Sequence, residues 1–143
     1  MPYRYLDDIA ISDVAFEAEG ASLVDVFRAA AEATTNAMVE DLSELEPEER
    51  LDFELKAPEL DLLLYDFLGE LVFLKDARGL LLRVESLCID EVEDGFSLKA
   101  RVAGEHINRE KHSLRADVKA VTLHRFTLER SENGWKARVV LDV

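Results

Sequence analysis

The residues best able to bind an ion lie near the two ends of the 143-residue sequence. Asp13 stands close to the start, and Asp142 and Val143 are the last two residues. Hard cations such as Ca²⁺ and Mg²⁺ take several oxygen ligands, commonly from carboxylates and backbone carbonyls. If the first and last strands are neighbours in one sheet, these residues could hold such a cation. The alternative is an ion pair between Asp142 and Arg125, with Asp13 serving in a turn.

A lysine and three histidines complete the set of side chains that could do chemistry. Lys119 stands among apolar residues, where a lysine usually extends its charge to solvent or pairs with an acid; contact with a phosphate or carboxylate is the other interpretation. His106, His112 and His124 match no zinc-binding spacing, and His124 is expected in the core or at a sheet edge. Phosphate-loop, dinucleotide-binding, zinc-protease and nucleophile-elbow motifs do not occur in the sequence. These patterns give no indication of an enzyme.

The composition argues against direct contact with nucleic acid. The sequence has 31 acidic and 17 basic residues, a formal net charge of −14 at pH 7. Because nucleic-acid binding depends on Lys and Arg displacing counterions, most of this surface would repel RNA. The single cysteine, Cys88, excludes an internal disulfide framework and is expected to be buried. Without a recognisable secretory signal or a bilayer-length apolar run, we expect a soluble cytoplasmic protein with no membrane partner.

The periodicity of the apolar residues predicts the elements that position these side chains. A period of two predicts strands over residues 3–6, 14–19, 51–57, 80–89, 96–102 and 116–130. Spacing of about 3.6 residues predicts two amphipathic helices, one opened by Ser22 and one over residues 59–75 that ends before Gly79. A change of phase near Glu85 and Ser86 predicts a bulge. Two helices with mostly antiparallel strands predict an α+β layered sandwich, formed by a single domain over residues 1–143.

The last hairpin is expected to turn at Asn133-Gly134, a pair that favours two-residue turns. Leu128 would then face Val139, and Arg125 would face Asp142. Apolar residues would meet apolar ones and a base would meet an acid, as cross-strand pairing prefers. This register makes Arg125 the competing partner for Asp142.

The later part of the sequence carries a specific pattern. Gly104-Glu105, Lys111-His112 and the run from Asp117 to His124 (Asp-Val-Lys-Ala-Val-Thr-Leu-His) resemble the archease signature, in which Gly-Glu and Lys-His precede Val-Lys-Ala-Val-Thr-x-His. The ending Val139-Val140-Leu141-Asp142-Val143 is similar to that family's Val-Ile-Leu-Asp followed by an apolar residue. Residues 62–71 resemble its Leu-Leu-Tyr-x-Phe-Leu-x-Glu-Leu helix. The sequence therefore resembles archeases over essentially its whole length.

The N-terminal motif of the family is only partly present. Archeases usually carry His-Thr-Ala-Asp, with the aspartate seven residues before a glycine. Counting back from Gly20 gives Ala10-Ile11-Ser12-Asp13 here, so the aspartate is present and the histidine and threonine are replaced. Asp7 and Asp8 lie too far back to take its place. The resemblance thus carries over the carboxylate of Asp13 but leaves no histidine at residue 10.

The resemblance implies a metal-binding accessory protein that is not itself an enzyme. The family's functional residues correspond to Asp13, Lys119, Asp142 and the main chain of Val143. The two aspartates and Val143 would bind a divalent cation, with calcium expected and magnesium or manganese as alternatives. The protein would stimulate guanylylation and multiple turnover of an RtcB-type RNA ligase in tRNA splicing or RNA repair. The ligase would bind GTP and Mn²⁺, and the acidic surface would suit docking on this basic partner.

Two other functions compete with this one. The first is a metal-dependent phosphoester hydrolase that uses Asp13 and Asp142. The second is a chaperone-like modulator of several nucleic-acid enzymes, which would bind unrelated partners equally well and would not depend on Asp142.

Overall fold

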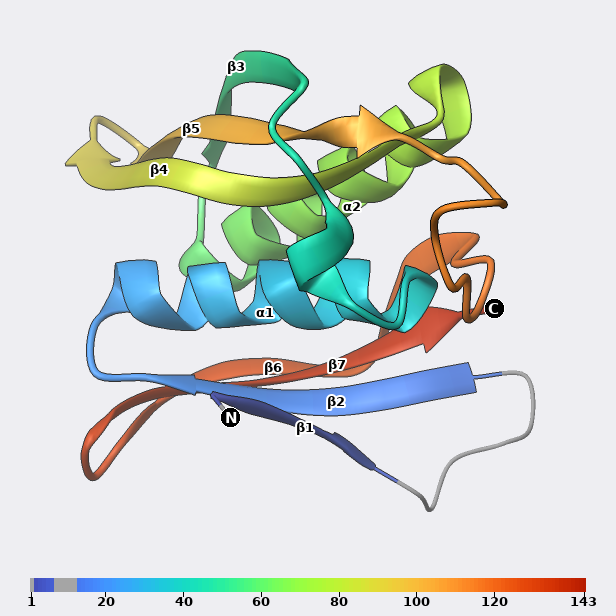
Figure 1. Ribbon diagram of the computed structural model, residues 1–143. Coiled ribbons are helices and arrows are strands. Elements are labelled where there is room, and N and C mark those ends of the chain that lie inside the picture. The colour runs from blue at the N-terminus through green and yellow to red at the C-terminus, as the bar shows by residue number, and fades with distance from the viewer. Residues whose placement is uncertain (1, 7–12) are drawn as a thin grey trace.

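Within residues 2–6 and 13–143, which the computed structural model describes, two antiparallel sheets enclose a layer of two helices (Figure 1). The strand order is β1-β2-β7-β6 in one sheet and β3-β5-β4 in the other. The α+β layered sandwich predicted from the sequence is confirmed. The elements are β1 (Tyr3–Leu6), β2 (Asp13–Gly20), α1 (Leu23–Met38), the 3₁₀ helix η1 (Leu42–Glu44), β3 (Glu49–Ala57), α2 (Leu60–Arg78), β4 (Leu80–Val92), β5 (Gly95–His106), β6 (Ala120–Ser131) and β7 (Gly134–Asp142).

Helix α1 lies between the sheets because apolar side chains, many of them small, cover most of its surface. Ser22 begins it as predicted, since its hydroxyl accepts a hydrogen bond from the N–H of Asp25 at 3.1 Å. The small side chains let the backbone of both sheets come close to the helix. Helix α1 therefore packs on β2 in one sheet and on β4 in the other. Its buried alanines are Ala29, Ala30, Ala31, Ala33 and Ala37.

Helix α2 packs beside α1 and ends at a glycine, as the sequence predicts. Gly79 takes a left-handed φ of 66°, and its N–H donates to the carbonyl of Lys75 at 2.9 Å. Phe67 of α2 stacks on Phe27 of α1 with the ring centroids 6.1 Å apart. In the described part of the chain, no helix combines the length and the apolar character needed to cross a membrane.

Strand β4 contains the predicted bulge. Its register with β5 shifts between Val84 and Ser86, which confirms the break in alternation read from the sequence. The first half of the strand is mostly buried and the second half mostly exposed. Cys88 lies in the second half and is exposed, so the expectation that its thiol is buried was wrong.

The β6–β7 hairpin turns one residue earlier than predicted. Its turn residues are Glu132 and Asn133, and Leu128 faces Ala137. The reason is a close approach between distant backbone segments: a β-carbon at Gly134 would collide with the carbonyl oxygen of Gly20. Gly134 therefore lies at the start of β7 with a φ of 142°, where only a glycine fits, and is not part of the turn.

A second irregularity changes the partner predicted for Asp142. The register of β6 against β7 shifts between Thr122 and Thr127, and Arg125 lies in this interval with a φ of 54°. The residue of β6 opposite Asp142 is Ala120. The predicted pairing of Asp142 with Arg125 was therefore wrong.

Strand β6 also begins later than predicted, at Ala120 instead of residue 116. The N–H groups of Arg115 and Ala116 donate to the carbonyls of Met38 and Ala37, at 2.8 and 3.0 Å. The last carbonyls of a helix need such donors because the helix itself does not supply them. The segment before β6 thus caps α1 before it joins the sheet.

Candidate functional site

The four-stranded sheet brings Asp13, Asp142 and Lys119 together at one end. Asp13 begins β2 and lies directly opposite Asp142, the last residue of β7. On the other side of β7, the N–H of Lys119 donates to the carbonyl of Asp142 at 2.8 Å. Figure 1 shows this end of the sheet beside the C-terminus, where β2 begins. Asp13 and Lys119, both chosen from the sequence, are thus neighbours of Asp142 on the two sides of β7.

The two aspartates form an electrostatically unfavourable pair. Directly opposed residues of antiparallel strands have β-carbons about 4.5–5.5 Å apart, and like charges in this position destabilise the sheet. Among the described residues, no ion pair involves Asp13 or Asp142. Arg125 instead lines a cavity with Glu17 and Arg138. Two facing carboxylates and a nearby main chain are a donor set that suits an oxygen-preferring divalent cation.

The other residues predicted for the site differ in how exposed they are. Val143 is half-buried and packs against the core just after β7. The side chain of Lys119 is exposed, and His124 is exposed on the edge strand β6. Asp7, Asp8 and Ala10-Ile11-Ser12 lie outside the described residues.

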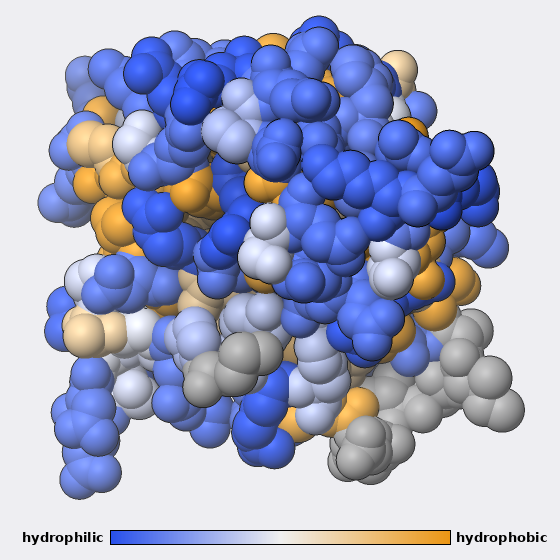
Figure 2. All heavy atoms as spheres, viewed as in Figure 1, coloured by the Kyte–Doolittle hydropathy of each residue, from blue (hydrophilic) through white to orange (hydrophobic). Residues whose placement is uncertain are grey.

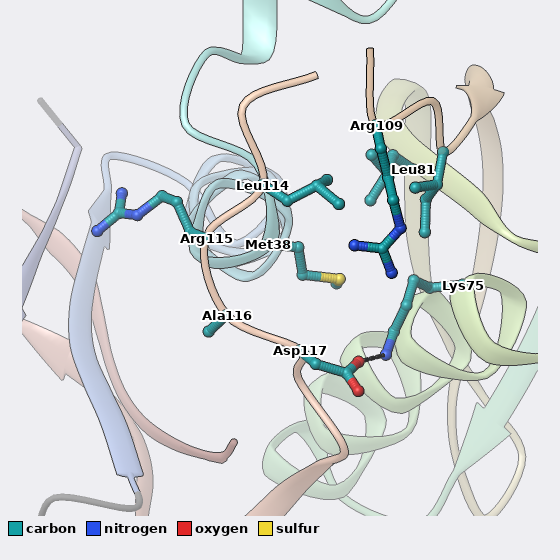
Figure 3. Close-up of a pocket in the computed structure, with 9 residues that line it drawn as sticks. Met38, Lys75, Leu81, Arg109, Leu114, Arg115, Ala116 and Asp117 are labelled. Carbon is teal, nitrogen blue, oxygen red and sulfur yellow. Dashed lines mark hydrogen bonds and ion pairs between the residues drawn. The ribbon is translucent and has the colours of Figure 1, made fainter. Parts of the chain in front are cut away.

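Lys75 of α2 holds the segment that leads to Lys119. Its ammonium group donates to the carboxylate of Asp117 at 2.7 Å (Figure 3). It also donates to the carbonyl of Val118 at 2.7 Å and pairs with Asp76. The Lys75 side chain is only 7% exposed. Burial alone would lower the pKa of Lys75, but hydrogen bonds to Asp117 and Asp76 outweigh burial and raise it. The charged ammonium therefore ties α2 to the residue just before Lys119.

A cavity of about 250 Å³ lies beside this ion pair. Met38 and Leu81 are among its apolar lining residues, and the guanidinium group of Arg109 points into it (Figure 3). The ammonium of Lys75 is already bonded, and the carboxylate of Asp117 offsets part of the positive charge. We therefore interpret the cavity as a gap in the packing between α1, α2 and the segment 107–117.

The Gly-Glu and Lys-His parts of the signature form a second polar cluster. Glu105 is 3% exposed, and its carboxylate lies 2.6 Å from Nε2 of His112 and 2.8 Å from Nζ of Lys111. The N–H of Asn108 donates to Nδ1 of His112 at 3.0 Å, which assigns the ring hydrogen to Nε2 as the donor to Glu105. Burial alone would raise the pKa of Glu105, but hydrogen bonds from Lys111 and His112 lower it overall. The cluster fixes the loop that follows β5.

Glu46 and Glu48 approach Glu105 closely enough for the three carboxylates to surround a metal ion. The ammonium group of Lys111 already lies close to these carboxylates. It bonds to Glu105 and is attracted by the charges of Glu46 and Glu48. These interactions, with the Glu105 hydrogen bond the largest, raise the pKa of Lys111. We therefore interpret the group as an ion-pair cluster in which Lys111 supplies the positive charge.

Acid is expected to open the Glu105 cluster. Because the folded state lowers the pKa of Glu105, its stabilising effect is complete above about pH 4.3, the ordinary glutamate pKa, and is lost as the pH falls further. We expect Glu105→Gln to reduce the free energy of unfolding at pH 7 by about 1–3 kcal/mol. Urea unfolding of both proteins from pH 3 to 7 measures this difference. A difference that does not shrink below about pH 4 would contradict the assignment.

The family model described as the archease protein family (MTH1598/TM1083) matches residues 3–143. This chain belongs to the archease family. A protein archease of Thermococcus kodakarensis is 35% identical to it over 133 residues, which are 92% of this chain and 93% of the relative. The resemblance recognised in the signature residues is thus confirmed.

Two solved structures share the fold of this archease-family chain. The solution structure of Methanobacterium thermoautotrophicum protein 1598 has a TM-score of 0.85 and 36% identity, with 99% of each chain covered. The crystal structure of an archease from Thermotoga maritima, described as a possible chaperone, has a TM-score of 0.61 and covers 96% of this chain and 97% of that one. At 20% identity, the second likeness concerns the fold alone.

Sequence reasoning missed the residues that support the site. Lys75 lies in the last turn of α2, where a basic side chain usually extends into water and is stabilised by the helix dipole. Glu105 and His112 were recognised only as letters of a signature, and their contact depends on the path of the loop between them. A buried glutamate needs a charged partner, so Gly-Glu at the end of an apolar strand was the available signal.

Proposed function

We propose that this archease-family protein is the accessory factor of an RtcB-type RNA ligase in tRNA splicing or RNA repair. It stimulates guanylylation of the ligase and allows multiple turnover, without being an enzyme itself. The observation that carries the proposal is the pairing of Asp13 with Asp142 across β2 and β7, with Lys119 bonded to the main chain of Asp142. Membership of the archease family supports the same function.

The proposed site combines carboxylates with one exposed cation. Asp13, Asp142 and the main chain of Val143 would hold a divalent cation, with calcium favoured because it accepts irregular sets of oxygen ligands, and magnesium or manganese as alternatives. When bound, the cation supplies positive charge that offsets the repulsion of the carboxylates and can contact phosphate oxygens. Lys119 would present its ammonium group to the same phosphates. Positioning of this kind changes rates strongly without any covalent chemistry by the accessory protein.

The surface suits a protein partner better than RNA. The net charge is −14, and the face in Figure 2 is predominantly hydrophilic. A ligase that binds RNA and GTP needs a basic surface, which an acidic protein can approach with favourable electrostatics. In this proposal the protein meets the ligase in the cytoplasm and makes no direct contact of its own with nucleic acid.

A multiple-turnover ligation assay with the cognate ligase, GTP and Mn²⁺ tests the proposal. Wild-type protein should raise turnover, and Asp13→Asn, Lys119→Met and Asp142→Asn should each reduce that stimulation about tenfold or more, because a misplaced positioning group costs up to about 10²-fold. Asp90→Asn, an exposed aspartate on β4, should stimulate as the wild type does. No stimulation by wild type, or full stimulation by all three site variants, would overturn the proposal.

A further inference from the structure

The outer side of α2 carries a groove that the proposed metal site does not use. It lies between α2 and the start of β6 and has a volume of about 520 Å³. Tyr65, Gly69 and Phe73 line it from α2, and Lys119 and Val121 line it from the other side. The three α2 residues are spaced by four positions, so they lie along one side of the helix. The groove therefore reaches the proposed site through Lys119.

The apolar side chains of this groove are partly uncovered. Phe73 is 58% exposed although it lies more than one turn from either end of α2. Leu62, which lies outside the groove on the same helix, is also exposed. Eleven residues are close to three helical turns, so Leu62 and Phe73 lie on the same side of α2. No large apolar residue of α1 is exposed in this way. Aromatic side chains are enriched in protein interfaces, so Phe73 is a candidate contact for a partner protein.

Gly69 provides a second, independent observation. A β-carbon at Gly69 would meet no atom within 4 Å, so no close packing inside this chain requires a glycine there. Glycine inside a helix is less favourable than alanine because it loses more backbone freedom on folding. The residue therefore lowers the stability of α2 while keeping the space between Tyr65 and Phe73 open.

The charges along the groove indicate what it binds. Asp66, Glu70 and Asp76 line it, against the single cation of Lys119. Asp76 pairs with Lys75, whereas Asp66 and Glu70 take part in no ion pair among the described residues. An acidic groove of this kind repels RNA. It complements a protein segment that carries an apolar side chain beside Lys or Arg.

We propose that the groove docks a basic segment of the ligase, with an apolar side chain seated over Gly69 and with Lys or Arg facing Asp66 and Glu70. The inference rests on the proposed function, because it takes the ligase as the partner. Docking and stimulation then belong to different residues. The residues of α2 that line the groove bind the ligase. The end of the sheet that carries Asp13 and Asp142 then stimulates the bound ligase.

The affinity of the full-length protein for the intact ligase, measured by calorimetric titration, tests the inference. Phe73→Ser and the double variant Asp66→Lys with Glu70→Lys should each raise Kd about tenfold or more. Gly69→Gln should also raise Kd while raising Tm by roughly 2–4 °C, because it removes a helix glycine and fills the groove. A loss of affinity with a gain in stability excludes misfolding as the cause.

The matched controls lie on the β4–β5 hairpin, which belongs to the other sheet. Val92→Ser removes an exposed apolar side chain there, and Glu91→Lys with Glu93→Lys reverses the same number of charges at exposed positions. Both should leave Kd within about twofold of the wild-type value.

The outcomes separate this inference from the proposed function. If the groove variants bind the ligase as tightly as the controls do, the inference is overturned, even if wild type stimulates ligation. If the groove variants lose affinity while wild type binds without stimulating, the groove assignment holds and the proposed function fails. If wild type shows no binding to the ligase, the inference is also overturned.

Discussion

Asp142→Asn is expected to stabilise the metal-free protein and to remove its stabilisation by Ca²⁺. In the wild type, Asp142 lies directly opposite Asp13 across β2 and β7. Asparagine keeps the shape of the side chain and removes one of two repelling charges, which should raise the free energy of unfolding in chelator by about 0.2–1 kcal/mol. At a Ca²⁺ concentration a hundred times Kd, the wild type should gain about 2.7 kcal/mol, and the variant should not.

Thermal unfolding in chelator and at increasing Ca²⁺ concentration measures both effects. Asp13→Asn should behave like Asp142→Asn, because the two residues form one pair. Asp90→Asn removes an acidic charge from an exposed position on β4 and should keep the full Ca²⁺ response. A Ca²⁺-dependent rise in Tm that survives in both Asp13→Asn and Asp142→Asn would exclude these residues as ligands.

Lys75→Met is expected to destabilise the protein and to impair its effect on the ligase. Methionine preserves the length of the side chain but leaves the buried carbonyl of Val118 without its donor, and it releases Asp117. An unsatisfied buried acceptor costs about 1–3 kcal/mol, so urea unfolding should show a loss of this size. Because the chain that leads to Lys119 is no longer tied to α2, stimulation should fall even at temperatures where the variant is folded.

Lys99→Met provides the matched control for this change. Lys99 pairs with Glu54 at 3.8 Å on the surface, and its side chain is 68% exposed. Surface pairs of this kind contribute between about 0 and 1 kcal/mol, so the control should remain close to wild type in stability and stimulation. Retained Ca²⁺ stabilisation in Lys75→Met would show that Asp13 and Asp142 are still in place. If Lys75→Met is as stable and as stimulatory as Lys99→Met, Lys75 does not position Lys119.

Features that depend on neighbouring residues could be read from the sequence. The hydroxyl of Ser22 caps α1, Gly79 ends α2, and the phase change near Ser86 corresponds to a real bulge. Each of these follows from interactions within a few residues, such as a cap hydrogen bond or a left-handed φ. The period of the apolar residues likewise identified the helices and most of the strands, because each element buries one side or more against the rest of the chain.

Features that depend on distant backbone could not be read in the same way. The hairpin register was wrong because Gly134 meets Gly20, and β6 starts late because Arg115 and Ala116 cap α1. Lys75 is another case, since a lysine near a helix end is ordinarily solvated and only the fold places Asp117 and Val118 around it.

The candidate site shows the same division. The sequence, through its family signature, identified Asp13, Lys119, Asp142 and Val143 as the residues of interest. Their spacing along the chain implied no contact, and local pairing favoured Arg125 as the partner of Asp142. The register shift in β6 removed that alternative, and the order β1-β2-β7-β6 set Asp13 opposite Asp142. Strand order and register depend on the packing of whole sheets against α1 and α2, which no local pattern of residue types encodes.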